Sequence, residues 1–361
     1  MEANQTNNFL LFDDPLTQFS AMIDDIRNAK EQILLQTFRL GNDEIGQKFK
    51  LELTKKAKEG LEIYLLLDAF GTRLSKSYFS EMMKFGANVK FFKKIRISFG
   101  LFRKNHRRNH RKLLIIDHQI TYIGSSNLTN YCLNWREDCL RIESTIANKF
   151  RKIFFENYDI ADYLYANRKN KKALARKTKY SGFEIICDVP STIQIPTRNK
   201  FINLINSAKK EITITTPYFL PGHAINKAIK DALARNVKVK LIIPLHSDVK
   251  FFDIVRNRSL GKYFKAGVEI IEYQTSNLHA KLFLVDDEEF VLGSSNFDYR
   301  SFWYMYEINI CGKDANIIHQ IKTHFQNTEK ESIAFEYEKW EKRSINIKII
   351  ENLLLPLRHL F

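Results

Sequence analysis

The sequence predicts an α/β protein of two similar halves, each a mostly parallel β-sheet flanked by helices, with an active site at their interface. Three observations predict this fold. The chain has 361 residues, 44% of them hydrophobic, which is enough for two domains with a core each. Strand-like apolar runs alternate with helical patterns, as they do in βαβ units. A block of the first half also recurs in the second half.

The repeated block is the most informative of these features. NHRKLLIIDHQITYIGSSN, from Asn109 to Asn127, matches LHAKLFLVDDEEFVLGSSN, from Leu278 to Asn296. The histidine, the lysine, the aspartate and the GSSN tetrapeptide each recur 169 residues later, without a gap. The same spacing joins Asp138 to Glu307, so each half has a carboxylate 28 residues after its histidine. Spacing this regular argues against coincidence.

The same order of elements is expected in both halves. A β-rich run (33–38 and 212–216) precedes a helix and then a hydrophobic strand (63–67 and 239–243). Within the block, LLIID and LFLVD are expected to be short strands, each followed by a turn and a second strand, TYIG or FVLG. GSSN then supplies a glycine turn with small side chains.

Composition indicates the boundaries of the halves. We expect a first repeat over residues 1–165, a basic linker over 166–182, a second repeat over 183–340 and a C-terminal amphipathic segment over 341–361. The chain has seven basic residues and no acidic one between Arg168 and Lys179, which is typical of an exposed linker.

The charge and the cysteines narrow the class of protein. The net charge of +16 favours anionic partners, and lipid surfaces and nucleic acids both fit. No apolar run is long enough to span a bilayer, and the N-terminus lacks the pattern of a secretory signal, so a cytoplasmic or surface-bound protein is expected. The four cysteines form no CxxC pair and are expected to be reduced core thiols. No pattern indicates a cofactor or a protein partner.

Two His–Lys pairs are the candidate catalytic residues. Residues two apart on a strand point to the same side, so His110 with Lys112, and His279 with Lys281, can each face one pocket. Brought together across the interface of the repeats, they would surround one phosphodiester. One imidazole would attack phosphorus to form a phosphohistidine, and the other would protonate the departing oxygen.

Other residues of the block are expected to support this chemistry. The lysines and the GSSN residues would donate to the phosphate oxygens, the latter being Ser125, Asn127, Ser294 and Asn296. Asp138 and Glu307 are the candidates for a carboxylate behind each imidazole. Asp117 and Asp286 complete each motif, but at i+7 from the histidines they would face away and support the scaffold. No metal is expected, because a lysine beside each histidine repels a cation.

HxKxxxxD followed by GSSN resembles the signature of the phospholipase D superfamily, and the resemblance extends along nearly the whole chain. The chain is most similar to bacterial cardiolipin synthases in that superfamily, especially at TPYFLP (Thr216–Pro221) and NFDYRSF (296–302). The resemblance implies a bilobal α/β fold with the active site between the halves, and transfer of a phosphatidyl group without a metal. It also implies that His110 is the nucleophile and His279 the acid.

Many cardiolipin synthases carry N-terminal membrane-spanning helices, whereas none is expected in this sequence. The chain therefore resembles the shorter, peripheral type, which we expect on the inner face of the cell membrane. Two segments are candidates for membrane contact, although each could instead pack on its own domain. Phe91–Lys112 interleaves aromatic residues with nine Lys and Arg residues. The C-terminal segment places apolar residues on one helical face until Pro356 would end it: Ile350, Leu353, Leu354, Leu357 and Phe361.

The leading prediction is a phosphatidyltransferase that makes cardiolipin from phosphatidylglycerol and a second phospholipid. Two other activities share its chemistry. A phospholipase D-type hydrolase results if water attacks the intermediate in place of a lipid alcohol. A nuclease would apply the same step to nucleic acid, whose phosphate backbone suits the charge of +16.

Overall fold

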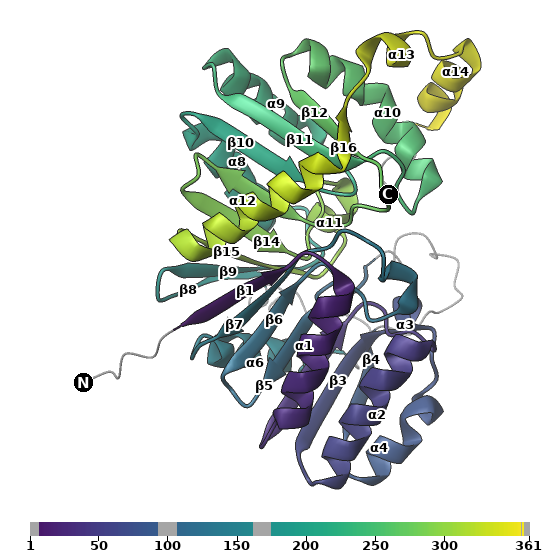
Figure 1. The fold of residues 1–361 in the computed structure, drawn as a ribbon, viewed down its shortest axis with the longest axis vertical. Coiled ribbons are helices and arrows are strands. Elements are labelled where there is room, and N and C mark those ends of the chain that lie inside the picture. The colour runs from purple at the N-terminus through teal and green to yellow at the C-terminus, as the bar shows by residue number, and fades with distance from the viewer. Residues whose placement is uncertain (1–6, 93–106, 162–174, 355, 357–361) are drawn as a thin grey trace.

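The computed structural model describes residues 7–92, 107–161, 175–354 and 356. Each half of the chain is built on one β-sheet, and the two sheets lie between two sets of helices (Figure 1). The first sheet has the order β1-β7-β6-β5-β2-β3-β4. Its strands are β1 Asn8–Phe12, β2 Gln32–Thr37, β3 Glu62–Asp68, β4 Asn88–Phe92, β5 Leu113–Ile116, β6 Ile120–Gly124 and β7 Cys139–Glu143.

The second sheet repeats this arrangement and extends it at both edges. Its order is β16-β12-β11-β10-β13-β14-β15-β9-β8. Its strands are β8 Arg176–Tyr180, β9 Phe183–Asp188, β10 Glu211–Thr215, β11 Lys238–Pro244, β12 Glu269–Tyr273, β13 Leu282–Val285, β14 Glu289–Gly293, β15 Glu307–Gly312 and β16 Ser332–Ala334. The prediction of two α/β halves flanked by helices is therefore confirmed.

Both sheets are mixed, so the prediction of mostly parallel sheets was wrong in this detail. Only β2-β3-β4 and β10-β11-β12 are parallel. The motif strands form the hairpins β5–β6 and β13–β14, which join β2 and β10 in antiparallel fashion. A tight turn can connect only antiparallel strands, whereas parallel neighbours need a crossover. The alternation of strands and helices that predicted a parallel sheet holds only for the first part of each half.

Helices cover the outer face of each sheet (Figure 1). In β2, Ile33 and Leu35 pack outward among α1 and α2 residues, while Leu34 points to the other sheet. Helix α2 begins at an N-cap close in sequence, where the Asp43 carboxylate accepts the Gly46 N–H at 3.1 Å. The helices are α1 Pro15–Asn28, α2 Glu44–Lys58, α3 Ala69–Thr72, α4 Ser80–Lys84, α6 Ala147–Asp159, α8 Pro196–Ser207, α9 Gly222–Ala234, α10 Lys250–Lys265, α11 Tyr299–Trp303, α12 Ala315–Lys330, α13 Tyr337–Glu341 and α14 Ile345–Leu354.

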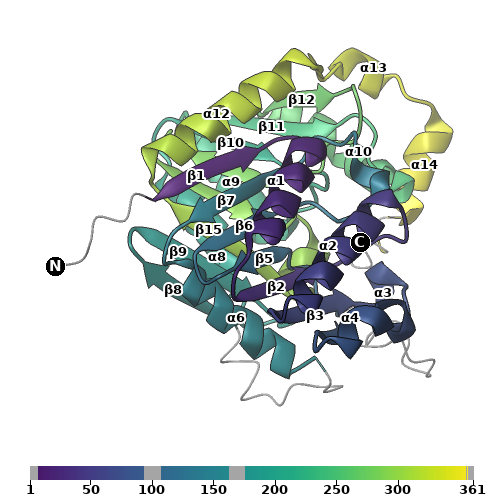
Figure 2. The ribbon, with the colours of Figure 1, turned by 60° about the horizontal axis from the view of Figure 1, so that its bottom comes forward.

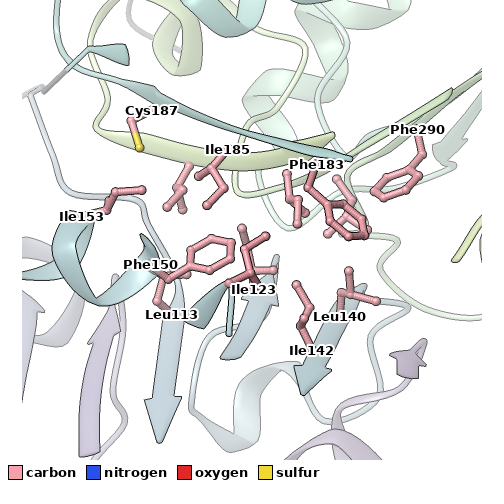
Figure 3. Close-up of a cluster of buried hydrophobic side chains, with 14 of the residues drawn as sticks. Leu113, Ile123, Leu140, Ile142, Phe150, Ile153, Phe183, Ile185, Cys187 and Phe290 are labelled. Carbon is pink, nitrogen blue, oxygen red and sulfur yellow. The ribbon is translucent and has the colours of Figure 1, made fainter. Parts of the chain in front are cut away.

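A continuous apolar core joins the two halves (Figure 3). The inner faces of both sheets and one face of α6 contribute buried side chains to it, among them Leu113, Ile123, Leu140, Ile142, Phe150, Ile153, Phe183, Ile185 and Phe290. The halves are thus packed face to face, because separating them would expose this core to water.

The N-terminal strand also belongs to the contact between the halves. Strand β1 lies at the edge of the first sheet and next to α12 of the second half (Figure 2). The Gln320 side chain accepts the Leu11 N–H at 2.7 Å and donates to the Phe9 carbonyl at 3.0 Å. The four cysteines are buried free thiols, which confirms the expectation from the sequence.

The predicted linker is only partly a linker. Residues 176–180 form the edge strand β8, which pairs with β9 through a turn at Ser181 and Gly182. Alternating side chains on β8 let a basic run serve as a solvated edge strand, which composition alone did not reveal. Residues 166–174 lie outside the described residues. No helix in the described ranges is long and apolar enough to cross a bilayer.

Candidate active site

A cavity of about 230 Å³ lies where the halves meet, and residues of both halves line it. His110 and His279 are on its wall, together with Asn127 and Asn296. The structure therefore brings the two motif histidines and the two GSSN asparagines to one site. Residues that also line the cavity include Phe38, Arg39, Tyr131, Trp135, Tyr218, Asp248, Val249, Phe252 and Arg300.

Backbone pairing across the interface fixes both histidines. The His110 N–H donates to the Tyr306 carbonyl at 2.9 Å, and the Tyr306 N–H donates to the Arg108 carbonyl at 2.8 Å. The second histidine repeats this arrangement: the His279 N–H donates to the Arg136 carbonyl at 2.7 Å. Each histidine-bearing segment thus pairs with the segment of the other half that leads to a carboxylate.

The carboxylate behind each imidazole comes from the opposite half. Nδ1 of His110 lies 3.1 Å from the Glu307 carboxylate, and Nδ1 of His279 lies 2.9 Å from that of Glu137. A carboxylate at Nδ1 orients the ring, fixes its tautomer and leaves Nε2 for chemistry. The expected arrangement is present, but the partner of His279 is Glu137.

Asp138, predicted for that role from the regular spacing, does not hydrogen-bond His279. Its Oδ1 accepts the Lys281 N–H at 2.6 Å, and its Oδ2 is buried without a hydrogen-bond partner among the described residues. The register of the sheet explains the correction. Gly124 pairs with Cys139, whereas Gly293 pairs with Asn309, so the loop after GSSN is one residue longer in the second half. Beyond that loop the equivalent positions are 170 residues apart, and Glu137 corresponds to Glu307.

The two glycines of GSSN allow the close approach of this neighbouring strand. A Cβ on Gly124 would lie 2.2 Å from the Asp138 carbonyl oxygen, and one on Gly293 would lie 2.3 Å from that of Ile308. Any larger residue would push the two strands apart. Since the carboxylates stand beside these contacts, glycine helps to set the distance between histidine and carboxylate.

The GSSN serines do not face the cavity. The fully buried hydroxyls of Ser125 and Ser294 donate to the carboxylates of Glu137 and Glu307, respectively. Their assignment to phosphate binding was therefore wrong: they hold the carboxylates that hold the histidines. The asparagines keep their proposed role, since Asn127 and Asn296 line the cavity and their amide groups can donate to a phosphate.

Both motif lysines are buried next to the histidines, behind the cavity wall. Nζ of Lys112 donates to the His110 carbonyl at 2.8 Å. Nζ of Lys281 donates to the His279 carbonyl at 2.6 Å and lies 3.2 Å from both nitrogens of the ring. Burial and the neighbouring Lys281 charge lower the pKa of Lys112 to about 7, and burial also lowers the pKa of Lys281.

The two histidines differ in their electrostatic surroundings. Burial lowers the pKa of His110 well below its usual range, and the charges of Lys112 and Arg300 lower it further. Burial also lowers the pKa of His279, but the carboxylates of Glu137 and Asp248 oppose that effect. A neutral imidazole is thus favoured at His110, while His279 has more support for a bound proton.

The carboxylates differ in the same sense. Burial raises the pKa of Glu307 to about 7, with the Lys112 charge opposing it. Burial would also raise the pKa of Glu137, but the contacts with His279 and Lys281 outweigh burial and hold that pKa below its usual range. An ionised Glu137 supports an imidazolium at His279.

The motif aspartates lie at hairpin turns away from the cavity. The Asp117 carboxylate accepts the backbone N–H groups of residues 30–32 at 2.7–3.0 Å, and Asp286 accepts those of residues 209–211 at 2.7–2.9 Å. Both aspartates have a left-handed backbone, with φ of 49° and 54°. Each therefore ties its motif hairpin to the start of the neighbouring strand, β2 or β10, and holds the histidine indirectly.

Comparison with known proteins identifies the family of this chain. The family described as "Cardiolipin synthase, PLD-like domain" matches residues 22–158 and 201–328, one match in each half. The chain belongs to this family. A cardiolipin synthase of Clostridium perfringens (strain SM101) is 31% identical over 368 residues, covering 97% of this chain and 76% of the relative. The major cardiolipin synthase ClsA of Bacillus subtilis is 30% identical over 366 residues, covering 98% and 76%.

A solved structure supports the fold of this cardiolipin synthase-like chain. The phosphatidylserine synthase of Haemophilus influenzae Rd KW20 superposes with a TM-score of 0.78 at 16% identity, covering 98% of this chain and 95% of that one. The predicted family, its bilobal fold and an enzyme of the phosphatidyltransferase type are thus confirmed.

Sequence reasoning missed several polar groups of this cardiolipin synthase-like site. Glu137 was hidden by the one-residue difference in loop length. Arg300 belongs to NFDYRSF, which was used only as a mark of resemblance. It lines the cavity, and its buried Nε has no hydrogen-bond partner among the residues that the structure describes. A signal was present for the glutamate, because a gapped alignment of NWRED with MYE pairs Glu137 with Glu307.

Proposed function

We propose that this enzyme makes cardiolipin by moving a phosphatidyl group from phosphatidylglycerol to the hydroxyl of a second phospholipid, through a phosphohistidine. One observation carries the proposal: two imidazoles, each held at Nδ1 by a buried glutamate of the other half, line the same cavity. That geometry provides a nucleophile and an acid for one phosphodiester. The names of the relatives support a phospholipid as the substrate.

In the first step, Nε2 of His110 attacks phosphorus, so that a P–N bond forms and the P–O bond to the glycerol headgroup breaks. His279 gives its proton to the departing oxygen. In the second step, the acceptor hydroxyl loses its proton to His279 and attacks phosphorus, and the P–N bond breaks. Asn127, Asn296 and the adjacent cations stabilise the charge on the phosphate oxygens in both steps.

The electrostatics of the site support His110 as the nucleophile. A nucleophile must be neutral, and the cations around His110 favour that form. A proton donor must be protonated, and Glu137 and Asp248 beside His279 favour that form. The family resemblance implies the same division of roles.

Product analysis tests the proposal. Purified protein is incubated with vesicles of phosphatidylglycerol, with and without phosphatidylethanolamine, and the lipids are separated. Cardiolipin and free glycerol in equal amounts are expected. Phosphatidic acid in place of cardiolipin would instead identify a hydrolase, which shares the intermediate. Cleavage of DNA at moderate salt without lipid turnover would identify a nuclease, the alternative that the charge of +16 favours.

We further propose that the enzyme works on the inner face of the cell membrane as a peripheral protein. Helix α14, which lies beside α10, supports this location (Figure 1). The side chains of Ile345, Ile349 and Leu353 are four residues apart and are 68%, 50% and 70% exposed, so they form one apolar stripe. Such a stripe on a basic protein suits an anionic bilayer surface.

The position of α14 connects this stripe to the active site. Its last residue, Leu354, packs against the buried cluster that contains Phe252, and Phe252 also lines the cavity. The helix is held by polar contacts, since Glu351 accepts from Asn257 at 2.6 Å and from Arg343 at 2.8 Å. A bilayer that covers the stripe would therefore lie close to the cavity. Most of the other candidate segment, Phe91–Lys112, lies outside the described residues.

Triple replacement of Ile345, Ile349 and Leu353 by Ser tests this location. Flotation with anionic vesicles should fall, along with turnover of vesicle lipid, while turnover of a short-chain soluble phosphodiester should persist. Ile193→Ser is the control for loss of an exposed isoleucine, because Ile193 is 77% exposed and lies ahead of α8, outside α14. Unchanged flotation of the triple variant would contradict the role of α14.

A further inference from the structure

The cavity contains two arginine–tyrosine pairs whose positions are exchanged between the halves. Leu40 forms a bridge with Leu128, and Phe219 forms the equivalent bridge with Phe297. The residue before Leu40 is Arg39, while the residue before Phe219 is Tyr218. Three residues after the second bridging residue, the first half has Tyr131 and the second half has Arg300. Each side of the cavity thus has one arginine and one tyrosine, contributed by opposite positions.

The two arginines serve different parts of the cavity. Arg300 lies near His110, whose pKa its charge lowers. Arg39 is exposed and lies over the ring of Tyr131, 5.5 Å from its centroid.

Arg39 is connected to the other histidine by a row of aromatic rings. The rings of Tyr131 and Trp135 have centroids 5.0 Å apart, and those of Trp135 and His279 are 5.2 Å apart. Ring contacts therefore join the cavity-lining Arg39 to His279, the residue to which the acceptor hydroxyl loses its proton.

The backbone of Arg39 is fixed while its guanidinium is available. The Arg39 carbonyl accepts the Leu128 N–H at 3.0 Å, which holds the loop against the cavity. The guanidinium makes no hydrogen bond or ion pair within the described ranges. Its charge acts on Asp43, whose carboxylate already accepts from Gly46, Thr129 and Asn130.

We propose that Arg39 binds the phosphate of the acceptor lipid. This inference rests on the proposed function, in which the attacking alcohol belongs to a molecule that carries its own phosphodiester. The reacting phosphate lies between the histidines, so the second phosphate needs a cation of its own, one headgroup away on the side of His279. A planar guanidinium with several N–H donors matches a phosphate in charge and geometry. The ligand class is thus an alcohol linked to an anionic phosphodiester.

A competition between two acceptors tests the role of Arg39. Phosphatidylglycerol vesicles with ethanol give cardiolipin and phosphatidylethanol from one common intermediate, so their ratio reports on the acceptor alone. Ethanol carries no phosphate. Arg39→Gln should lower the ratio of cardiolipin to phosphatidylethanol on the order of tenfold or more, because it removes a charged hydrogen bond to the acceptor. Arg39→Lys should lower the ratio less, because the lysine ammonium keeps the positive charge.

Lys230→Gln, on the exposed surface of α9, is the control for the loss of one positive charge and should leave the ratio unchanged. The inference is overturned if Arg39→Gln lowers both products in parallel or leaves their ratio as in the parent. Its failure is distinct from failure of the proposed function, in which the parent enzyme itself would make no cardiolipin. Thermal melting of each variant checks that the fold is intact.

Discussion

His110 and His279 occupy equivalent positions in the two halves, yet the additional charged residue near each ring has the opposite sign, Arg300 for His110 and Asp248 for His279. Both rings contact a glutamate of the other half, and a buried serine hydroxyl holds each glutamate. Each ring also has its motif lysine nearby, but His110 has in addition Phe38 and the cation Arg300, whereas His279 has Trp135 and the acid Asp248.

The comparison separates what duplication conserves from what it allows to change. The backbone pairing between the halves and the contact between histidine and glutamate recur in both halves, because they set the position of each imidazole. The charged residues around each ring differ, and they set which proton state the ring prefers. A duplicated scaffold can therefore supply two different catalytic roles without any change in fold.

The largest expected effect is the loss of either histidine. His110→Ala and His279→Ala should each lower turnover of phosphatidylglycerol on the order of 10³-fold or more, and the double variant should be hardly worse, because the two act as one unit. A phosphodiester with a nitrophenol leaving group distinguishes the nucleophile from the proton donor, since nitrophenolate departs without a proton. His279→Ala should then release a burst of nitrophenol, whereas His110→Ala should not. A burst only in His110→Ala would reverse the assignment.

The glutamates come next. Glu137→Gln should reduce turnover on the order of 10²- to 10⁴-fold, because the amide no longer supports an imidazolium at His279. Asp138→Asn tests the alternative from the regular spacing, and it should reduce turnover far less, since the Asp138 carboxylate accepts the Lys281 backbone N–H and, among the described residues, no imidazole. Steady-state rates of both variants decide between the two acids. A larger loss in Asp138→Asn would contradict the contact seen in the structure.

A smaller effect is expected in the pH profile. The pKa of Lys112 is lowered from 10.5 to about 7, so its positive charge is present below that pH and is lost as the pH rises through it. Turnover should therefore fall on the alkaline side. Lys112→Arg keeps a charge at high pH and should shift this fall to higher pH, whatever its effect on the maximum. An unshifted alkaline limb would show that another group causes it.

The smallest and most symmetrical effect concerns the hairpin turns. Asp117→Ala and Asp286→Ala each remove the acceptor of three backbone N–H groups. Each should lower the free energy of unfolding by about 1–3 kcal/mol, and by similar amounts in the two halves. Urea denaturation measures both. A loss confined to one half would show that the hairpins are not equivalent.

Much of the fold could be predicted because the repeat is regular up to GSSN. The shared spacing identified His110 and His279, and period-two spacing placed their lysines beside them. Glu137 escaped because the same regular spacing was extended across a loop that differs by one residue. The serines were misassigned because a hydroxyl suits phosphate and carboxylate equally, and only the sheet decides which it meets. Arg39 and Arg300 lie far from each other in sequence, so their common cavity depends on the tertiary fold.

Catalysis depends on the contact between the halves, because backbone hydrogen bonds across the interface hold both histidines. The segment that carries each histidine is paired with the opposite half, so neither half alone contains a histidine with its glutamate. Drawing the halves apart would disable both centres at once, even if each sheet stayed folded. A substitution near Glu307 will therefore resemble a defect of the first motif, and one near Glu137 a defect of the second. The position of such a substitution in the chain therefore indicates the wrong half as the site of the catalytic defect.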